Sequence, residues 1–179
     1  LVGSEMCIRD RFRTADEIII DEVAYSSKWH AHSVKNKKGV ALERIDPDAA
    51  TQDAANWTSA SETVGYGTPG YQNSQYKDAS SGDATGIEPP VWIEESGSYT
   101  VSYLLDRPGY SCRAFVFNTS GLRVADISNH ELLGISGKIT WSGVANNGSP
   151  LQTGVYIFYA EIYHPEGTVK RFKKAFLIR

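Results

Sequence analysis

The sequence predicts an all-β protein, with a complete β-sandwich in its C-terminal half and an incomplete sandwich segment before it. No stretch repeats apolar residues at helical spacing over several turns, whereas short alternating and β-branched runs recur throughout. Turn residues separate these runs. After residue 90 the candidate strands follow one another at close to the roughly 8–12 residue spacing that is typical of a β-sandwich.

The composition is that of a globular chain without a strongly basic surface. Its 179 residues are 41% hydrophobic, and 18 basic against 21 acidic residues leave a net charge of −3. Nucleic-acid-binding domains usually carry a basic face, so we expect no nucleic acid among the partners. No apolar run approaches the roughly 18–20 residues that span a bilayer, so we expect no membrane insertion. Two cysteines, Cys7 and Cys112, cannot build a disulfide framework.

The first residues are expected to be foreign to the protein. Leu1–Asp10 read LVGSEMCIRD, which resembles the translation of a transposon-end adapter used in DNA library preparation, and Arg11 would span the junction. We therefore interpret residues 1–11 as a non-native segment; a genuine short strand is the alternative. Because Met6 is the only methionine, we also expect the native start to lie further upstream.

Candidate strands follow the alternating runs in chain order. The N-terminal half contains Glu17–Tyr25 and Val40–Ile45. The C-terminal half contains Val91–Glu94, Tyr99–Leu105, Ser111–Phe117, Leu122–Ile127, Lys138–Trp141, Gly154–Tyr163 and Thr168–Ile178. Turn sequences such as Asn146-Asn147-Gly148 and Pro165-Glu166-Gly167 separate them.

A segment without large apolar side chains divides the chain in two. Residues 77–86 are rich in Ser, Gly, Ala and Asp, which indicates a flexible linker; a long surface loop within one domain is the alternative. The predicted organisation is therefore a first module over 12–77, a linker over 78–88 and a sandwich over 89–179.

The last two candidate strands have unusual patterns. Gly154–Tyr163 is apolar on both faces: Tyr156, Phe158, Ala160 and Ile162 form one face, and Val155, Ile157, Tyr159 and Tyr163 form the other. Such a strand is central and covered on both sides, or one of its faces meets another domain. Thr168–Ile178 carries Lys170, Arg171, Lys173 and Lys174. These charges suit an edge strand that resists pairing, or one that a partner recognises by strand addition.

The C-terminal half resembles a known module. The run from Ser111 to Val124, followed by Trp141-Ser142-Gly143 and by Gly148, Leu151, Gly154 and Tyr156, resembles the immunoglobulin-like module of the flagellar hook capping protein family. The resemblance implies an immunoglobulin-like β-sandwich. The family commonly has Asp after the tryptophan, where this chain has Ser142.

The same end of the chain resembles the C-terminal sorting domains of the type IX secretion pathway. The matching residues are Gly154-Val155-Tyr156, Gly167 and the run from Lys173 to Arg179. Those domains are small β-sandwiches read by an outer-membrane export machine in Bacteroidetes-type bacteria. The resemblance implies export through that machine.

The N-terminal half resembles the closing part of a bacterial lamin-tail domain. Three ordered motifs carry the likeness: Gly39–Ile45, Asn56–Ala60 and Gly67–Ser74. The family's sandwich is larger than the native residues before the linker allow. The resemblance therefore implies an incomplete lamin-tail-like sandwich, and we expect it to be only marginally stable alone.

Motifs that suggest chemistry have plainer interpretations. Gly65–Gly70 satisfies G-x-G-x-x-G, but no helical pattern follows it and Pro69 interrupts it, so turns are expected. His30 and His32 would share a face of an extended segment, but a zinc site needs further ligands. Glu94 and Glu95 would point to opposite faces of a strand. Cys112 is expected to be a small buried hydrophobe.

These observations predict a non-catalytic C-terminal fragment of a secreted or cell-surface bacterial protein, with no cofactor, no metal site and no catalytic residues. Its expected role is a structural spacer or a secretion, sorting and surface-attachment module. Its expected partners are secretion machinery, cell-surface components or upstream domains of the same chain, at the outer surface of a Gram-negative cell. The alternative is a carbohydrate- or protein-binding accessory module of an extracellular hydrolase or nuclease. An exposed, coplanar aromatic strip would favour it, drawn from Trp29, Trp57, Tyr66, Tyr71 and Tyr76.

Overall fold

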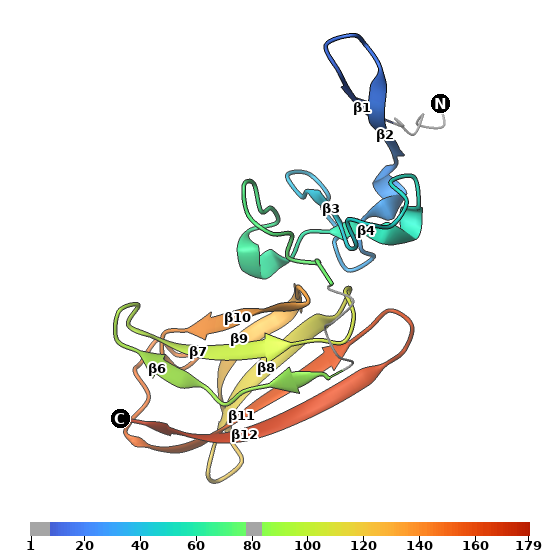
Figure 1. The fold of residues 1–179 in the computed structure, drawn as a ribbon. Helices are drawn as coiled ribbons and strands as arrows, with labels where there is room; N and C mark the ends of the chain where they lie inside the picture. The colour runs from blue at the N-terminus through green and yellow to red at the C-terminus, as the bar shows by residue number, and fades with distance from the viewer. Residues whose placement is uncertain (1–7, 78–83) are drawn as a thin grey trace.

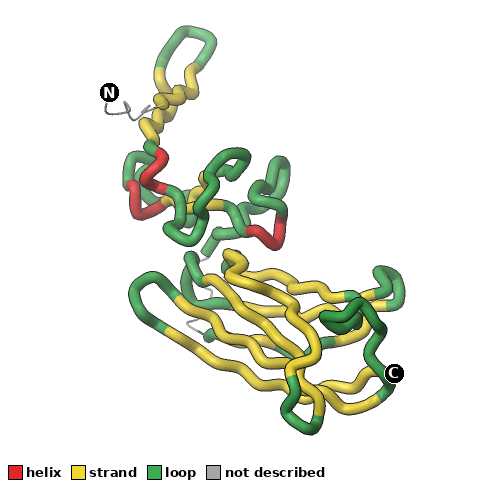
Figure 2. The backbone as a smooth tube through the Cα atoms, turned by 180° about the vertical axis from the view of Figure 1, so that it is seen from behind, coloured by secondary structure: helices red, strands yellow, loops and turns green. Residues whose placement is uncertain are grey.

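The computed structural model describes residues 8–77 and 84–179, and this part of the chain is all-β, as predicted (Figure 1). A projecting hairpin leads into a small middle region of short elements, which stands above a two-layered sandwich (Figures 1 and 2). Part of the predicted non-native segment, residues 1–7, and part of the predicted linker, residues 78–83, lie outside the described residues. No helix in the described ranges is long and apolar enough to cross a membrane.

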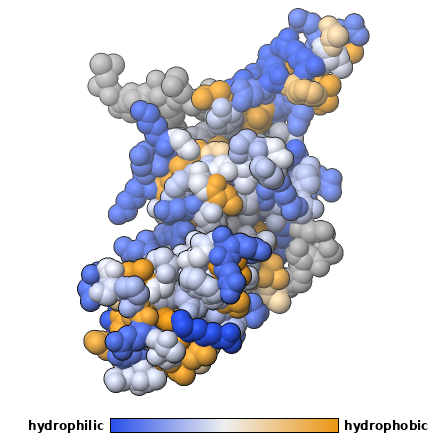
Figure 3. Space-filling model, turned by 90° about the vertical axis from the view of Figure 1, so that its left-hand side faces the viewer, coloured by the Kyte–Doolittle hydropathy of each residue, from blue (hydrophilic) through white to orange (hydrophobic). Residues whose placement is uncertain are grey.

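The hairpin consists of β1 (Ile8–Arg13) and β2 (Ile19–Tyr25), paired antiparallel. β1 overlaps residues 1–11, which we interpret from the sequence as a non-native segment. A genuine short strand was the alternative interpretation there. Phe12, Ile18 and Ile20 are exposed on this hairpin, where Figure 3 shows hydrophobic side chains among hydrophilic ones. The hairpin therefore buries little of its own apolar surface.

The middle region is built from short elements around one buried carboxylate. Two short strands, β3 (Leu42–Arg44) and β4 (Trp57–Ser59), pair antiparallel. The turns η1 (Ser27–Trp29), η2 (Ala54–Asn56) and η3 (Glu62–Val64) surround them. Glu43 of β3 is buried, and its carboxylate accepts hydrogen bonds from Thr68 Oγ1 at 2.5 Å and Ser74 Oγ at 2.7 Å. Burying a carboxylate is costly unless its oxygens are hydrogen-bonded, so these contacts organise the loops around it.

The sandwich has two antiparallel sheets within the described residues. The first sheet has the order β10-β7-β5, with β6 also pairing with β7. Its strands are β5 (Gly86–Ile87), β6 (Val91–Ile93), β7 (Ser98–Leu104) and β10 (Ser136–Trp141). The second sheet has the order β12-β11-β8-β9. Its strands are β8 (Ser111–Asn118), β9 (Arg123–Leu132), β11 (Gly154–Tyr163) and β12 (Val169–Ile178).

The core lies between the two sheets. Phe158, Ala160 and Ile162 of β11 are fully buried there, so of the two apolar faces in the sequence of this strand, this one is the inner face. Cys112 of β8 is buried in the same core, as predicted, and desolvation raises the pKa of its thiol to about 12. A thiol in these surroundings stays protonated and packs as an apolar side chain.

Some strand boundaries differ from the predicted ones. β9 continues to Leu132, past the expected end at Ile127, and its pairing with β8 contains register shifts. β5 lies inside the predicted linker 78–88, and Ile87 is buried, so the sandwich begins before residue 89. Glu94 and Glu95 lie in the turn after β6 and not on a strand.

The middle region and the sandwich touch at the corner between β9 and β10. Gln75 is fully buried, and its Nε2 donates to the carbonyl oxygens of Ser59 and Leu133, at 3.1 Å each. The backbone N–H of Ile135 donates to the carbonyl oxygen of Ser74 at 2.9 Å. The two predicted modules are thus joined by buried hydrogen bonds as well as by the chain between them.

Candidate functional site

The outer face of the second sheet is the candidate functional site. Ile157 of β11 pairs with Phe117 of β8 and with Ala175 of β12, on either side of it. Directly paired residues lie on the same face of an antiparallel sheet. Since Phe158 of β11 points into the core, its neighbour Ile157 and both pairing partners face outward. An apolar row therefore crosses the outside of the sheet.

A second row lies next to the first. Tyr159 pairs with Phe115, and the two rings stack with centroids 6.5 Å apart and planes 11° apart. Phe117 meets the Tyr159 ring edge-on, at 6.3 Å. The guanidinium of Arg123 lies 3.8 Å from the centre of the Phe115 ring, and that of Arg113 lies 5.6 Å away. These cations cover Phe115, which is only 7% exposed although it faces outward.

Other apolar side chains on this face are open to solvent. Val155 is 53% exposed and its pairing partner Leu177 is 49% exposed. A hollow of about 280 Å³ lies further along the face and is lined by Phe117, Gly121, Ile157, Tyr159 and Lys173. A sheet with one solvated face normally alternates apolar inward and polar outward residues. The part of this outer face around Val155, Ile157 and Leu177 is apolar and exposed in the described chain, so it has the character of an interaction surface.

The charges around the face are predominantly positive. Arg171 is paired with Glu161 at 2.9 Å, and Arg123 is paired with Asp126. The hydrogen bond from Arg123 holds the pKa of Asp126 below its usual range, so this carboxyl stays ionised. Lys173 also borders the apolar face, and no carboxylate of the described residues lies within ion-pair distance of it. The face therefore carries surplus positive charge at its rim.

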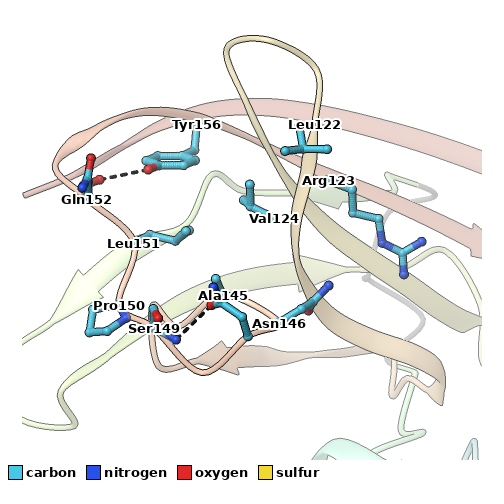
Figure 4. A pocket seen from close by; sticks show the side chains of 11 residues that line it. Leu122, Arg123, Val124, Ala145, Asn146, Ser149, Pro150, Leu151, Gln152 and Tyr156 are labelled. Atoms are coloured by element: carbon cyan, nitrogen blue, oxygen red, sulfur yellow. Dashed lines mark hydrogen bonds between the residues drawn. The ribbon is translucent and has the colours of Figure 1, made fainter.

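A second hollow lies at the end of the sandwich (Figure 4). It has a volume of about 420 Å³, with Leu151 and Tyr156 on one side and Val124 on the other. Its polar groups already bind one another: the Tyr156 hydroxyl donates to the carbonyl oxygen of Gln152 at 3.0 Å, and Asn147 Oδ1 accepts from the N–H of Ser149 at 3.0 Å. This hollow therefore offers few unsatisfied polar groups to a ligand.

The structure does not form the aromatic strip that would favour carbohydrate binding. Trp29 and Trp57 are adjacent, with centroids 6.2 Å apart, but their planes are tilted by 32° and both are partly buried. Trp57 Nε1 donates to the carbonyl oxygen of Thr51 at 2.9 Å, which fixes the ring in the middle region. Tyr71 is 84% exposed, whereas Tyr66 and Tyr76 are partly buried. Of the five rings only that of Tyr71 is exposed, so they form no exposed strip.

The other residues noted in the sequence have structural surroundings. His30 Nδ1 lies 2.9 Å from Ser59 Oγ, and burial followed by the nearby Lys37 charge lowers the pKa of His30. In the described ranges no three His, Cys, Asp or Glu residues are placed to hold a metal ion. The Gly65–Gly70 loop follows the short turn η3 and lies over the Glu43 carboxylate, which would repel a phosphate.

Sequence reasoning found one half of the candidate site. The two-sided apolar pattern of Gly154–Tyr163 predicted either a central strand covered on both sides or a strand with one face that meets another domain. The contribution of Phe115, Phe117 and Leu177 was missed, because it depends on the register between β8, β11 and β12. The sequence does contain one indication of the contribution of β8: Phe115 and Phe117 alternate with Val116, so both faces of that strand are apolar.

Comparisons with known proteins add little to these observations. No family model matches the chain, and no curated protein matches it. Among solved structures, one similar chain is PorZ, described as an essential bacterial surface component of the type IX secretion system of Porphyromonas gingivalis. The match is 18% identical, covers 54% of this chain and 12% of that chain, and has a TM-score of 0.31. A likeness of this extent carries no argument about function, and the family resemblances above remain predictions.

Proposed function

We propose that this chain is a non-catalytic part of a secreted or cell-surface bacterial protein, whose sandwich docks on secretion machinery or on another cell-surface component. The observation that carries the proposal is the outer face of the β12-β11-β8-β9 sheet. Its exposed apolar side chains include Val155, Ile157 and Leu177.

The chemistry of this face favours a protein partner. Covering exposed apolar side chains gains roughly 25 cal/mol per Å² of buried area, which an apolar patch on another protein can supply. The surplus positive charge of Lys173 fits a partner with acidic residues around that patch. A spacer that docks on nothing would be expected to carry polar side chains at Val155 and Ile157.

The test places the chain behind a periplasmically exported reporter, in a host that carries the type IX machinery. We expect the reporter at the cell surface or in the medium. Replacing Val155→Thr and Ile157→Thr together keeps β-branched residues on β11 but removes apolar surface from the face. We expect this double variant to keep the reporter in the periplasm.

A matched control separates docking from a general loss of apolar surface. Leu122 is exposed in the turn between β8 and β9, so Leu122→Thr should leave the reporter at the surface. Far-ultraviolet circular dichroism of the purified variants checks that both remain folded. Retention of the reporter with the unchanged chain would contradict the sorting role, and export of the double variant would contradict docking through this face.

A further inference from the structure

The free edge of β12 is a feature separate from the outer face. β12 pairs with β11 on one side, and no strand of the described chain pairs with its other side. A sheet edge presents unpaired N–H and C=O groups, which can accept a further strand. The two halves of this edge differ in what lies against them.

The first half of the edge is blocked by a polar contact. Lys170 Nζ donates to Thr85 Oγ1 at 2.7 Å and to Asp106 Oδ1 at 2.9 Å, and the Thr85 hydroxyl also donates to Asp106. These contacts tie the beginning of β12 to the segment that leads into β5. A strand approaching Lys170 would have to break them, so this half is protected against pairing.

The second half of the edge borders a groove of about 790 Å³. The groove separates β6 from the end of β12, at the end of the sandwich where apolar surface appears in Figure 3. Its floor is aromatic: the Trp92 and Tyr99 centroids lie 5.0 Å apart, and those of Tyr99 and Phe176 lie 5.6 Å apart. Trp92 is 45% exposed, so its ring is available to a further side chain.

The backbone groups that face the groove follow from the register of the hairpin. The N–H of His164 donates to the carbonyl oxygen of Thr168 at 2.8 Å, which closes the β11–β12 hairpin with a hydrogen-bonded pair. Hydrogen-bonded and non-hydrogen-bonded pairs alternate along an antiparallel ladder. Counting along β12, Ala175 and Leu177 belong to non-hydrogen-bonded pairs. Their N–H and C=O groups therefore point away from β11, toward the free edge.

We propose that the half of β12 from Ala175 to Ile178 is a strand-addition site for an extended segment of a partner protein, with apolar side chains at alternate positions. One set of its side chains would pack on Trp92, Tyr99 and Phe176, while its backbone pairs with Ala175 and Leu177. This site goes beyond the docking face, because it uses the edge of the sheet and not its surface.

The charges of the groove indicate where the segment would carry an acidic residue. Arg179 lines the end of the groove that follows β12, and Lys174 directly precedes the groove-lining run Ala175–Ile178 in the sequence. Glu94 lines the opposite wall, after β6. The segment would therefore carry an acidic residue where it passes Arg179, and not where it passes Glu94.

The test uses the full chain and a short synthetic peptide in which valine alternates with threonine and which ends in two glutamates. Binding is followed by NMR of backbone amides. We expect the largest shifts at Ala175 and Leu177, and about tenfold weaker binding for the same peptide with N-methylated valines, which lack the donors that a strand needs. Shifts confined to Val91–Ile93, or equal binding of the methylated peptide, would overturn the proposal.

A pair of proline variants tests the edge itself. Ala175→Pro removes an N–H that faces the groove and leaves the β11 ladder intact, so we expect about tenfold weaker peptide binding. Val169→Pro makes the same change in the protected half of the edge and should bind the peptide as the unchanged chain does. Equal binding by both variants would refute the site. The variant with Val155→Thr and Ile157→Thr should still bind the peptide, which distinguishes this site from the docking face.

Discussion

Asp106 follows β7 and lies between Thr85 and Lys170. Burial by itself raises the pKa of this carboxyl, but hydrogen bonds from Thr85 and Lys170 outweigh burial and hold the pKa well below its usual range. A carboxyl with a lowered pKa in the folded state contributes stability above its unfolded pKa of about 4. That contribution is lost as the pH falls below this value toward the folded pKa.

Asp106→Asn should therefore change the acid dependence of folding. At pH 7 we expect the free energy of unfolding to fall by about 1–2 kcal/mol, discounted for partial solvent exposure. Between about pH 4 and pH 2 the variant should lose less stability than the unchanged chain, because it has no carboxylate to protonate there. Urea unfolding across this range measures both effects. Asp16→Asn, in the exposed hairpin turn, is the control, and parallel pH profiles for Asp106→Asn and the unchanged chain would contradict the expectation.

At the scale of the element, two adjacent residues of β12 differ in burial. Phe176 is buried against the rings of Tyr99 and Trp141, whereas Leu177 faces outward and is half exposed. Phe176→Ala should lower the free energy of unfolding by about 3–5 kcal/mol, because it opens a cavity in the core. Leu177→Ala should cost less than about 1 kcal/mol. Urea unfolding of both variants at neutral pH tests the register of β12, since a slip by one residue would exchange the two values.

The strands that could be predicted are those with long alternating patterns. Gly154–Tyr163 was predicted with the bounds that the structure shows, because ten residues of alternation leave little choice of register. β1, β4 and β5 were missed as strands: β4 and β5 are too short to show a period, and β1 was set aside with the adapter-like residues. β9 was predicted too short, because Ser128 and Asn129 resemble a turn and His130 adopts a positive φ inside the strand.

The candidate surfaces were only partly accessible from sequence. Alternation in β11 identified an apolar outer face, but only pairing with β8 adds Phe115 and Phe117 to it. The basic residues of the last strand predicted an edge, with resistance to pairing and strand addition as alternatives. The structure assigns resistance to pairing to the first half of β12 and strand addition to the second half. This division depends on the contact of Lys170 with Asp106, which is 64 positions away and cannot be predicted from the sequence.

At the scale of the whole molecule, polar residues join the middle region to the sandwich. Gln75 and Ser61 would be expected in solvated loops on composition alone, yet both are buried at the corner between β9 and β10. Removing a partner from a buried hydrogen bond costs about 1–3 kcal/mol. The middle region has few buried apolar side chains, among them Val34 and Ala60, so these contacts supply a large share of its stability.

Gly134 is the residue through which this coupling can be tested. A Cβ at Gly134 would lie 2.5 Å from the carbonyl oxygen of Ser74, a backbone atom that cannot move without moving its loop. Gly134→Ala should therefore push the two regions apart and cost about 1–3 kcal/mol. Gly86→Ala is the matched control, since nothing lies within 4 Å of a Cβ there.

Amide hydrogen exchange distinguishes coupled from independent regions. If the contacts at Gln75 hold the middle region in place, Gly134→Ala should speed exchange at Ile45 and Ala60, whose N–H groups donate within that region, while Val116 in the sandwich core stays protected. Two modules on a flexible linker would fold separately, and the variant would then leave Ile45 and Ala60 unchanged. Equal protection of these amides in the variant and in the unchanged chain would therefore support residues 78–88 as a linker between independent modules. Selective loss of protection at Ile45 and Ala60 would instead show that the middle region depends on its contacts with the sandwich for its stability.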